Sequence, residues 1–216
     1  MNNIKETLIE DGVVYLPDLF DKNMVGQIDN EIVNFLKEID LTQPNETDRY
    51  TVITPTNSKS WGYHALAGNP KPVIKVRGEH PWDDGMLDIF HIQKLIDMDD
   101  IIKSKELTNT FSDIKKSIRN INIYCNHSVT STREYHRDSK GGGQFKAFIY
   151  LTDVVDESYG PYSYMKGTHT ETTDEGEIVN YIADKGSLII SNQSGLHRGL
   201  PQQQGRSRRL ISINLG

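Results

Sequence analysis

Two residue types that bind transition metals stand two positions apart in this sequence, at His136 and Asp138. In an extended chain, side chains two positions apart point to the same side, so one imidazole and one carboxylate can reach one ion. The step alone carries little information, because the 7 histidines and 18 aspartates among the 216 residues produce about 0.6 such steps by chance. Whether His136 and Asp138 bind a metal therefore depends on a third ligand and on a fold that brings the three residues together.

His197 supplies a third ligand from a distant part of the chain. It follows a predicted apolar strand and a turn at Gly195, and it lies 61 residues after His136, a spacing that suits opposite strands of one barrel. Two histidines and one carboxylate cap one face of an octahedral iron ion and leave three positions open for dioxygen and a chelating co-substrate. A structural zinc site would close its coordination shell instead.

An arginine beyond His197 suits a co-substrate such as 2-oxoglutarate, whose distal carboxylate needs a rigid, permanently charged partner. Arg208 lies 11 residues after His197 at the start of a predicted strand. Alternation along that strand places Arg208 on the face of Leu210 and Ser212 and turns Arg209 to the other face. An ordinary surface charge is the competing interpretation of Arg208.

The elements around these residues predict a helix-rich first part and a β-rich second part. Residues 10–17 are typical of a turn and a short strand, after which Asp21 caps a helix with apolar residues at helical period. Further helices are expected around 86–98 and 104–118. Strands are expected at 121–126, 145–152, 162–165, 187–191 and 208–214.

This order of elements predicts a mainly β fold with flanking helices, a double-stranded β-helix (a cupin-like jelly roll) buttressed by N-terminal and middle helices. The length fits a single domain over 1–216, helix-rich in 1–118 and carrying the core strands and the metal site in 119–216. The polar segment 42–84 is expected either to form a lid or binding loop or to be a surface loop whose aromatic side chains fill the edge of the core.

Composition argues against several classes of partner. The net charge of -6 and the absence of a basic stripe argue against nucleic-acid binding. The apolar runs are strand-sized and the N-terminus lacks a signal-peptide core, which predicts a cytoplasmic protein without a membrane partner. The single cysteine, Cys125, agrees with a reducing compartment and is expected to be a buried apolar residue. The oligomeric state is left open.

Together these segments resemble the phytanoyl-CoA dioxygenase-like branch of the Fe(II)- and 2-oxoglutarate-dependent oxygenases. The resemblance covers most of the chain and follows the family's order of motifs. The matching parts are the opening at 9–20, the step at 135–138, the segment 147–169, and His197 with Arg208. Lys166 stands where the family has a proline, the residues 201–204 replace its usual Asn and Ser or Thr, and 42–84 matches no family segment.

The resemblance implies an enzyme that uses Fe(II), 2-oxoglutarate and O2 on a small molecule. Its catalytic metal ligands would be His136, Asp138 and His197, and its co-substrate residues would be Arg208 and, by position only, Asn122 and Tyr124. The expected reaction hydroxylates an unactivated C–H bond and releases succinate and CO2. The carboxylate of Asp138 favours hydroxylation over halogenation, since related halogenases replace it. Desaturation, ring formation and demethylation stay open, as does the identity of the substrate.

Two other classes of protein would use the same residues. One is a non-catalytic jelly-roll ligand-binding or sensor protein that retains the metal site, and the other is a zinc hydrolase with the same three ligands. A second His-x-carboxylate step at His169 and Glu171 is interpreted as a decoy, because it falls in a loop that the family uses for structure. Arg137, between the two ligands, should point away from the metal towards a surface ion pair.

Overall fold

The computed structural model describes residues 4–38, 45–46, 51–53, 85–90, 96–130, 132–141 and 143–216. Four α-helices lie among the described residues in the first part of the chain: α1 (Ile4–Glu10), α2 (Lys22–Glu38), α4 (Asp99–Ile102) and α5 (Lys105–Asp113). The strands are β1 (Val13–Leu16), β2 (Asn45–Glu46), β3 (Thr51–Ile53), β4 (Gly85–Phe90), β5 (Ile118–His127), β6 (Phe145–Tyr150), β7 (Tyr162–Met165), β8 (Ile178–Tyr181), β9 (Leu188–Asn192), β10 (His197–Gly199) and β11 (Ser207–Leu215).

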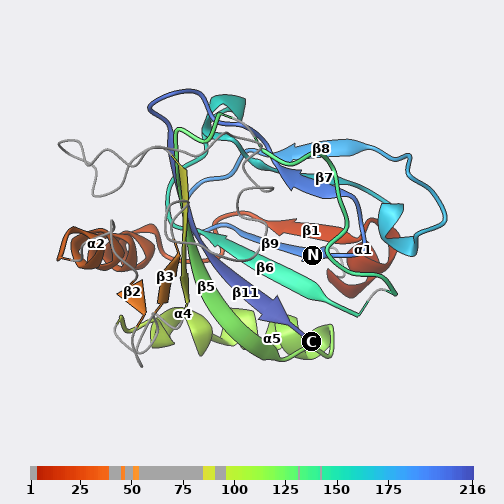
Figure 1. The fold of residues 1–216 in the computed structure, drawn as a ribbon. Coiled ribbons are helices and arrows are strands. Elements are labelled where there is room, and N and C mark those ends of the chain that lie inside the picture. The colour runs from red at the N-terminus through yellow and green to blue at the C-terminus, as the bar shows by residue number, and fades with distance from the viewer. Residues whose placement is uncertain are drawn as a thin grey trace.

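These strands form two antiparallel sheets (Figure 1). The large sheet has the order β1-β9-β6-β11-β5-β4-β3-β2, and the small sheet has the order β10-β7-β8. From β6 onwards the chain passes from the large sheet to the small one and back twice, which is the winding of a jelly roll. The mainly β fold with flanking helices, predicted as a double-stranded β-helix, is therefore confirmed.

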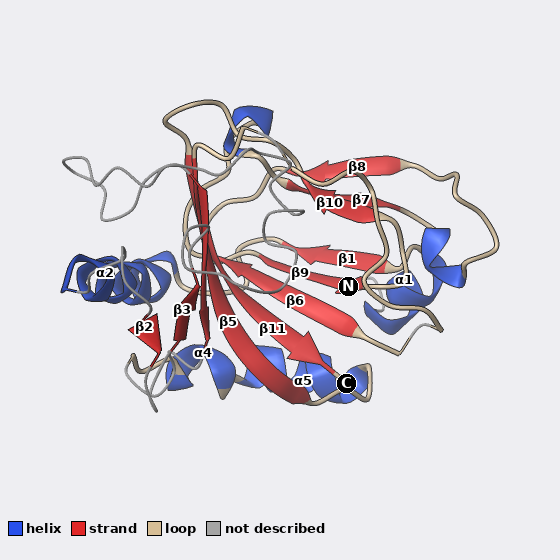
Figure 2. Cartoon of the chain, viewed as in Figure 1, coloured by secondary structure: helices blue, strands red, loops and turns tan. Residues whose placement is uncertain are grey.

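The period-two alternation of the strands divides the interior into two hydrophobic clusters. On β11, Ile211 and Ile213 belong to a cluster with the helices, whereas Leu210 belongs to a cluster with the small sheet. On β6, Ile149 and Phe148 divide in the same way. Helices α2 and α5 cover the outer face of the large sheet, and the small sheet covers its inner face (Figure 2).

The helix ends follow their local signals. Asp21 caps α2 as predicted, because its Oδ1 accepts hydrogen bonds from the backbone N–H groups of Asn23 at 3.0 Å and Met24 at 2.9 Å. Ser104 caps α5 in the same way through Leu107 N–H at 3.2 Å. Five predicted strands are found within a few residues of their expected limits, as β5, β6, β7, β9 and β11.

The helix predicted at 86–98 is wrong over its first part, because residues 86–90 belong to strand β4. Apolar residues at this spacing fit a helix as well as a strand, so the local pattern was ambiguous. Pairing decides the structure: β4 lies antiparallel to β5, from Gly85 opposite His127 to Phe90 opposite Asn122. A long neighbouring strand thus overrides local preference.

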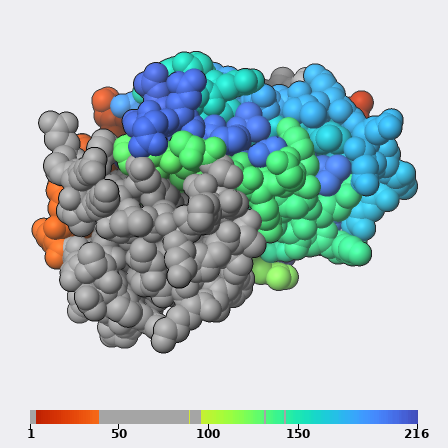
Figure 3. All heavy atoms as spheres, turned by 45° about the horizontal axis from the view of Figure 1, so that its top comes forward, coloured from red at the N-terminus to blue at the C-terminus, as the bar shows by residue number. Residues whose placement is uncertain are grey.

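Two short strands of the small sheet, β8 and β10, were not expected from the sequence. Most of the segment 42–84 lies outside the described residues, apart from β2 and β3, which extend the edge of the large sheet. No helix among the described residues is long and apolar enough to cross a membrane. In a space-filling view, the second half of the chain, coloured green to blue, forms a continuous surface on one face of the molecule (Figure 3).

Candidate metal centre and co-substrate pocket

His136 and His197 lie directly opposite each other in an antiparallel bridge. Each backbone N–H donates to the carbonyl of the other residue at 3.1 Å. His197 begins β10, and the bridge adds His136 to the same edge of the small sheet. Although the two residues are 61 positions apart in the sequence, the bridge places their imidazoles side by side, with ring centroids 4.7 Å apart.

Both imidazoles are oriented by the same local hydrogen bond. The Nδ1 of His136 lies 2.8 Å from the carbonyl oxygen of Glu134, and the Nδ1 of His197 lies 2.8 Å from that of Gly195. A carbonyl can only accept, so each Nδ1 carries a proton and Nε2 is the nitrogen that faces Asp138. The hydrogen bond at Nδ1 fixes the orientation of each ring and leaves Nε2 as the atom that a metal would meet.

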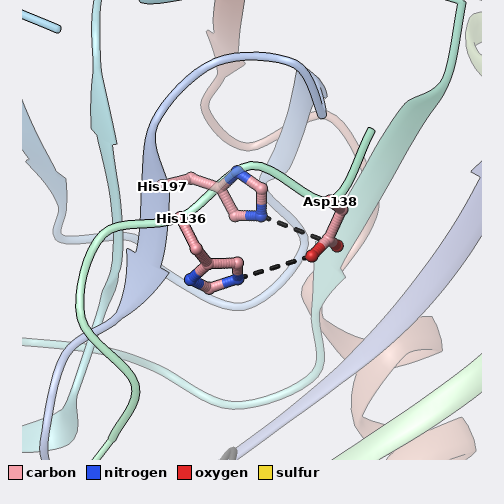
Figure 4. Close-up of side chains that lie close together, drawn as sticks. All are labelled: His136, Asp138 and His197. Atoms are coloured by element: carbon pink, nitrogen blue, oxygen red, sulfur yellow. Dashed lines mark ion pairs between the residues drawn. The ribbon is translucent and has the colours of Figure 1, made fainter. Parts of the chain in front are cut away.

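Asp138 completes the cluster from the loop after the bridge. Its backbone N–H donates to the carbonyl of Gln193 at 3.0 Å, which ties the loop to the segment before His197. The Asp138 carboxylate faces both rings: Oδ1 lies 3.4 Å from Nε2 of His136, and Oδ2 lies 3.7 Å from Nε2 of His197 (Figure 4). Three ligand atoms, one from each residue, all lie within 4.8 Å of one another. This separation suits donors around one ion.

The electrostatics favour the protonation states that a metal requires. Burial alone would raise the pKa of Asp138, but hydrogen bonds with His136 and His197 and the charge of Lys146 outweigh it and hold the pKa well below its usual value. Burial lowers the pKa of His197 despite the nearby carboxylate. The site therefore combines an ionised carboxylate with a neutral, buried imidazole, which is a metal-ligating set.

Two cations next to Asp138 were not found from the sequence. Lys146 Nζ lies 2.7 Å from Asp138 Oδ2, and Arg133 Nη2 lies 3.1 Å from Asp138 Oδ1. Lys146 lies two and four positions before Phe148 and Tyr150 on β6, so it shares with them the face that is turned to the small sheet. That alternation was a signal for Lys146, whereas Arg133 lies in an irregular loop without periodicity.

Arg208 lies in the interior of the jelly roll and not on its surface. Its residue is 7% exposed, and Nη1 donates to the carbonyl of Gly160. A Cβ added to Gly199, two residues after His197, would lie 3.3 Å from Arg208 Nη2, so the guanidinium lies against β10. Among the described residues no carboxylate pairs with Arg208, and its Nε is buried without a hydrogen-bond partner. Burial lowers its pKa, opposed by Tyr150.

The residues expected beside Arg208 share its face of the large sheet. In the pairing of β5 with β11, Asn122 lies opposite Ser212, Tyr124 opposite Leu210, and Asn126 opposite Arg208. Asn122 and Asn126 are buried, and within the described ranges the side-chain oxygen of each has no hydrogen-bond partner, nor does the hydroxyl of Ser212. Tyr124 packs against the cluster between the sheets. A concentration of unpartnered buried polar atoms is typical of a ligand pocket.

The other histidine step is engaged elsewhere, in agreement with its interpretation as a decoy. His169 contacts the carbonyl of Ile9 through Nε2 at 3.1 Å, whereas Glu171 accepts from the backbone N–H of Gly141 at 2.6 Å. Arg137 points away from the cluster and pairs with Asp174 at 2.7 Å, as alternation predicts. Cys125 is fully buried in the outer cluster.

Comparison with known proteins assigns the fold. No protein-family model and no curated protein sequence matches this chain. Among solved structures, the non-heme alpha-ketoglutarate-dependent epimerase SnoN from nogalamycin biosynthesis is similar with a TM-score of 0.66 at 13% identity, over 99% of this chain and 80% of its own. EctD from S. alaskensis, solved with 2-oxoglutarate and 5-hydroxyectoine, has a TM-score of 0.70 at 14% identity, over 100% and 76%.

The non-heme monooxygenase ThoJ, solved as a Ni complex, is similar with a TM-score of 0.66 at 15% identity, over 98% of this chain and 76% of its own. All three likenesses extend over nearly the whole of this chain. The fold is thus a jelly roll shared with non-heme enzymes, including ones described as dependent on alpha-ketoglutarate. At these identities the likeness establishes the architecture, and the chemistry must be argued from the residues of the site.

Proposed function

We propose that this protein is an Fe(II)- and 2-oxoglutarate-dependent oxygenase. The observation that carries the proposal is the combination of the His136, Asp138 and His197 cluster with a buried Arg208 that lies against the strand of His197 and meets no carboxylate among the described residues. Burying a cation without a counter-ion is costly, so its retention indicates an anionic ligand. A binding pocket for a dicarboxylate next to a metal centre explains both features.

The donor set fits iron. Two imidazoles and one carboxylate form a facial set that leaves coordination positions open, whereas a structural zinc site uses four protein ligands. Within the described residues the cluster offers three ligands and no fourth histidine, cysteine or carboxylate. Bound iron with 2-oxoglutarate supplies the activation of dioxygen, which is chemistry that amino-acid side chains lack.

The residues of this chain would bind and orient the reactants. His136, Asp138 and His197 would hold the metal, and Arg208 would bind the distal carboxylate of 2-oxoglutarate through charge-assisted hydrogen bonds. Asn122 and Tyr124 lie on the same face of the large sheet as Arg208 and would contact the co-substrate beside it. The tyrosine-rich cluster between the sheets would exclude water from the chelate.

The proposed reaction is hydroxylation of an unactivated C–H bond in a small molecule. Substrate, O2 and 2-oxoglutarate would give the hydroxylated product, succinate and CO2. Asp138 supports hydroxylation, since its carboxylate would occupy the coordination position that a halide takes in halogenases. The similar structures support the co-substrate: EctD was solved with 2-oxoglutarate, and SnoN with Fe3+, alpha-ketoglutarate and nogalamycin RO. The phytanoyl-CoA dioxygenase-like motifs support the same class.

An anaerobic titration with Fe(II) and 2-oxoglutarate tests this proposal. We expect the weak visible charge-transfer band of the chelate to appear in proportion to protein. No band with well-folded protein would overturn the oxygenase and favour a binding or sensor protein. A zinc hydrolase with the same ligands is distinguished by succinate, which we expect to form only with Fe(II), 2-oxoglutarate and O2.

A further inference from the structure

We propose that Arg133, assisted by Lys146, binds an oxyanion of the primary substrate, so that the enzyme acts on an anionic small molecule. This inference rests on the proposed function, because it names the substrate class of the same site. The oxyanion would be a carboxylate or a phosphate or sulfate group, which share two or more acceptor oxygens and a negative charge.

Both cations lie at the carboxylate of the candidate metal ligand Asp138. Arg133 approaches Oδ1 at 3.1 Å and Lys146 approaches Oδ2 at 2.7 Å, so one carboxylate serves two positive charges. The Nε of Arg133 is buried and has no hydrogen-bond partner in the described part of the chain, while the Arg133 side chain as a whole is 38% exposed. The guanidinium therefore keeps donor capacity and stays within reach of a small molecule.

Neighbouring arginines have carboxylates of their own. Arg137 pairs with Asp174 at 2.7 Å, and Arg198 pairs with Glu134 at 2.8 Å. The one carboxylate within 4.0 Å of Arg133 among the described residues is Asp138. When Asp138 binds a divalent metal, its negative charge is mostly neutralised, and its attraction for Arg133 weakens. An oxyanion of the substrate would then take its place as the partner of Arg133.

The formal charges of the loaded site point the same way. The formal charges of Fe(II), Asp138, dianionic 2-oxoglutarate and Arg208 sum to zero, because the metal and the arginine are positive and the three carboxylates balance them. Arg133 then adds a positive charge that none of these groups balances, and Lys146 strengthens the positive potential on the same side. A partly buried positive charge next to a metal favours binding of an anion.

Anion binding to the loaded protein tests the inference. Protein saturated anaerobically with Fe(II) and 2-oxoglutarate is dialysed to equilibrium against radiolabelled acetate or radiolabelled sulfate. We expect saturable binding of at least one anion, with acetate preferred for a carboxylate substrate and sulfate for a phosphate or sulfate group. Arg133→Gln should weaken that binding about tenfold, and Arg133→Lys should have an intermediate effect because it keeps the charge but loses the paired donors.

The matched control is Arg206→Gln, which removes the same charge from an exposed arginine whose guanidinium lies over the ring of Tyr159, 4.7 Å from its centroid. It should bind the anion as the unmodified protein does. Circular dichroism checks the fold of every variant.

Three results separate the outcomes. If the chelate band forms but neither anion binds saturably, or Arg133→Gln binds as tightly as the unmodified protein, the inference is wrong while the proposed function stands. If Arg133→Gln weakens 2-oxoglutarate and leaves the anion unaffected, Arg133 serves the co-substrate and the inference is also wrong. If folded protein gives no chelate band, the proposed function itself fails.

Discussion

Arg208 and Arg209 are neighbours in the sequence, yet they lie on opposite faces of the large sheet. Arg209 points to the helices and forms two hydrogen bonds with Asp29 of α2, at 2.5 Å and 2.6 Å. Arg208 points to the small sheet, where no described carboxylate meets it and its Nε has no partner. The outer arginine therefore has a carboxylate partner within the fold, whereas the inner arginine has none among the described residues.

The rest of the two faces differ in the same manner. The outer face of β11 carries Ile211 and Ile213, which pack in a hydrocarbon cluster with the helices. The inner face carries Ser212 opposite Asn122, and both have buried polar atoms that no other described residue bonds. We infer that the outer face stabilises the fold and that the inner face gives up stability to bind the metal and co-substrate.

Removing a metal ligand should have the largest effect. His136→Ala and Asp138→Ala each delete one of three ligands, so we expect coupled succinate formation to fall by about 10³-fold or more. Fe(II)-dependent succinate release is the measurement. His169→Ala is the control, since it removes a histidine of the decoy step that contacts Ile9, and it should retain turnover. Equal losses in both histidine variants would contradict the site.

Breaking the outer ion pair should lower stability without affecting the ligands. Arg209→Met leaves the buried carboxylate of Asp29 unpaired, so we expect the free energy of unfolding to fall by about 3 kcal/mol. Urea denaturation measures the loss, and the double variant Arg209→Met with Asp29→Leu should recover most of it. A change in 2-oxoglutarate affinity comparable to the stability loss would show that the two faces are not separate.

Replacing the inner arginine should give the reverse result. Arg208→Met removes the proposed partner of the distal carboxylate, and we expect 2-oxoglutarate affinity to fall by about 2 kcal/mol, or roughly 30-fold. The free energy of unfolding of the ligand-free protein should stay equal or rise, because a buried unpaired charge is removed. Titration of the chelate band gives the affinity. Unchanged affinity would refute the role of Arg208.

The smallest expected effects come from two adjacent residues of β11. Ser212→Ala removes a buried, unpartnered hydroxyl and should raise the free energy of unfolding of the ligand-free protein by about 1 kcal/mol. Ile211→Val removes one methylene group from the outer cluster and should lower it by about 1 kcal/mol. Urea unfolding of both variants measures the two changes in the free energy of unfolding. If both variants were less stable than the unmodified protein, the proposed difference between the inner and outer faces would be wrong.

Much of the fold could be predicted because alternation along a strand is a local property. The orientation of Arg208 and Arg209 follows from their positions on β11, and the direction of Arg137 follows from its place between two inward residues. Long apolar runs likewise located β6 and β9. The structure places His136, Asp138 and His197 together as the sequence predicted, while their role as metal ligands stays a prediction.

The remaining features depend on contacts that the sequence does not encode locally. β4 was expected as a helix, and its pairing with β5 on one side and β3 on the other makes it a strand. β10 has three residues, too few to show a period, although it carries His197. Arg133 lies in a loop, and its approach to Asp138 arises from the tertiary fold. Pairing and loop geometry thus limited the prediction more than burial did.

A crystal structure of the protein grown anaerobically with Fe(II) and 2-oxoglutarate tests the central claim most directly. We expect an anomalous iron peak between His136, Asp138 and His197, with 2-oxoglutarate chelating the iron and its distal carboxylate on the guanidinium of Arg208. The unpartnered atoms of Asn122 and Ser212 should lie in the same pocket. Iron bound elsewhere, or a distal carboxylate turned away from Arg208, would contradict the assignment of the inner face as the co-substrate pocket.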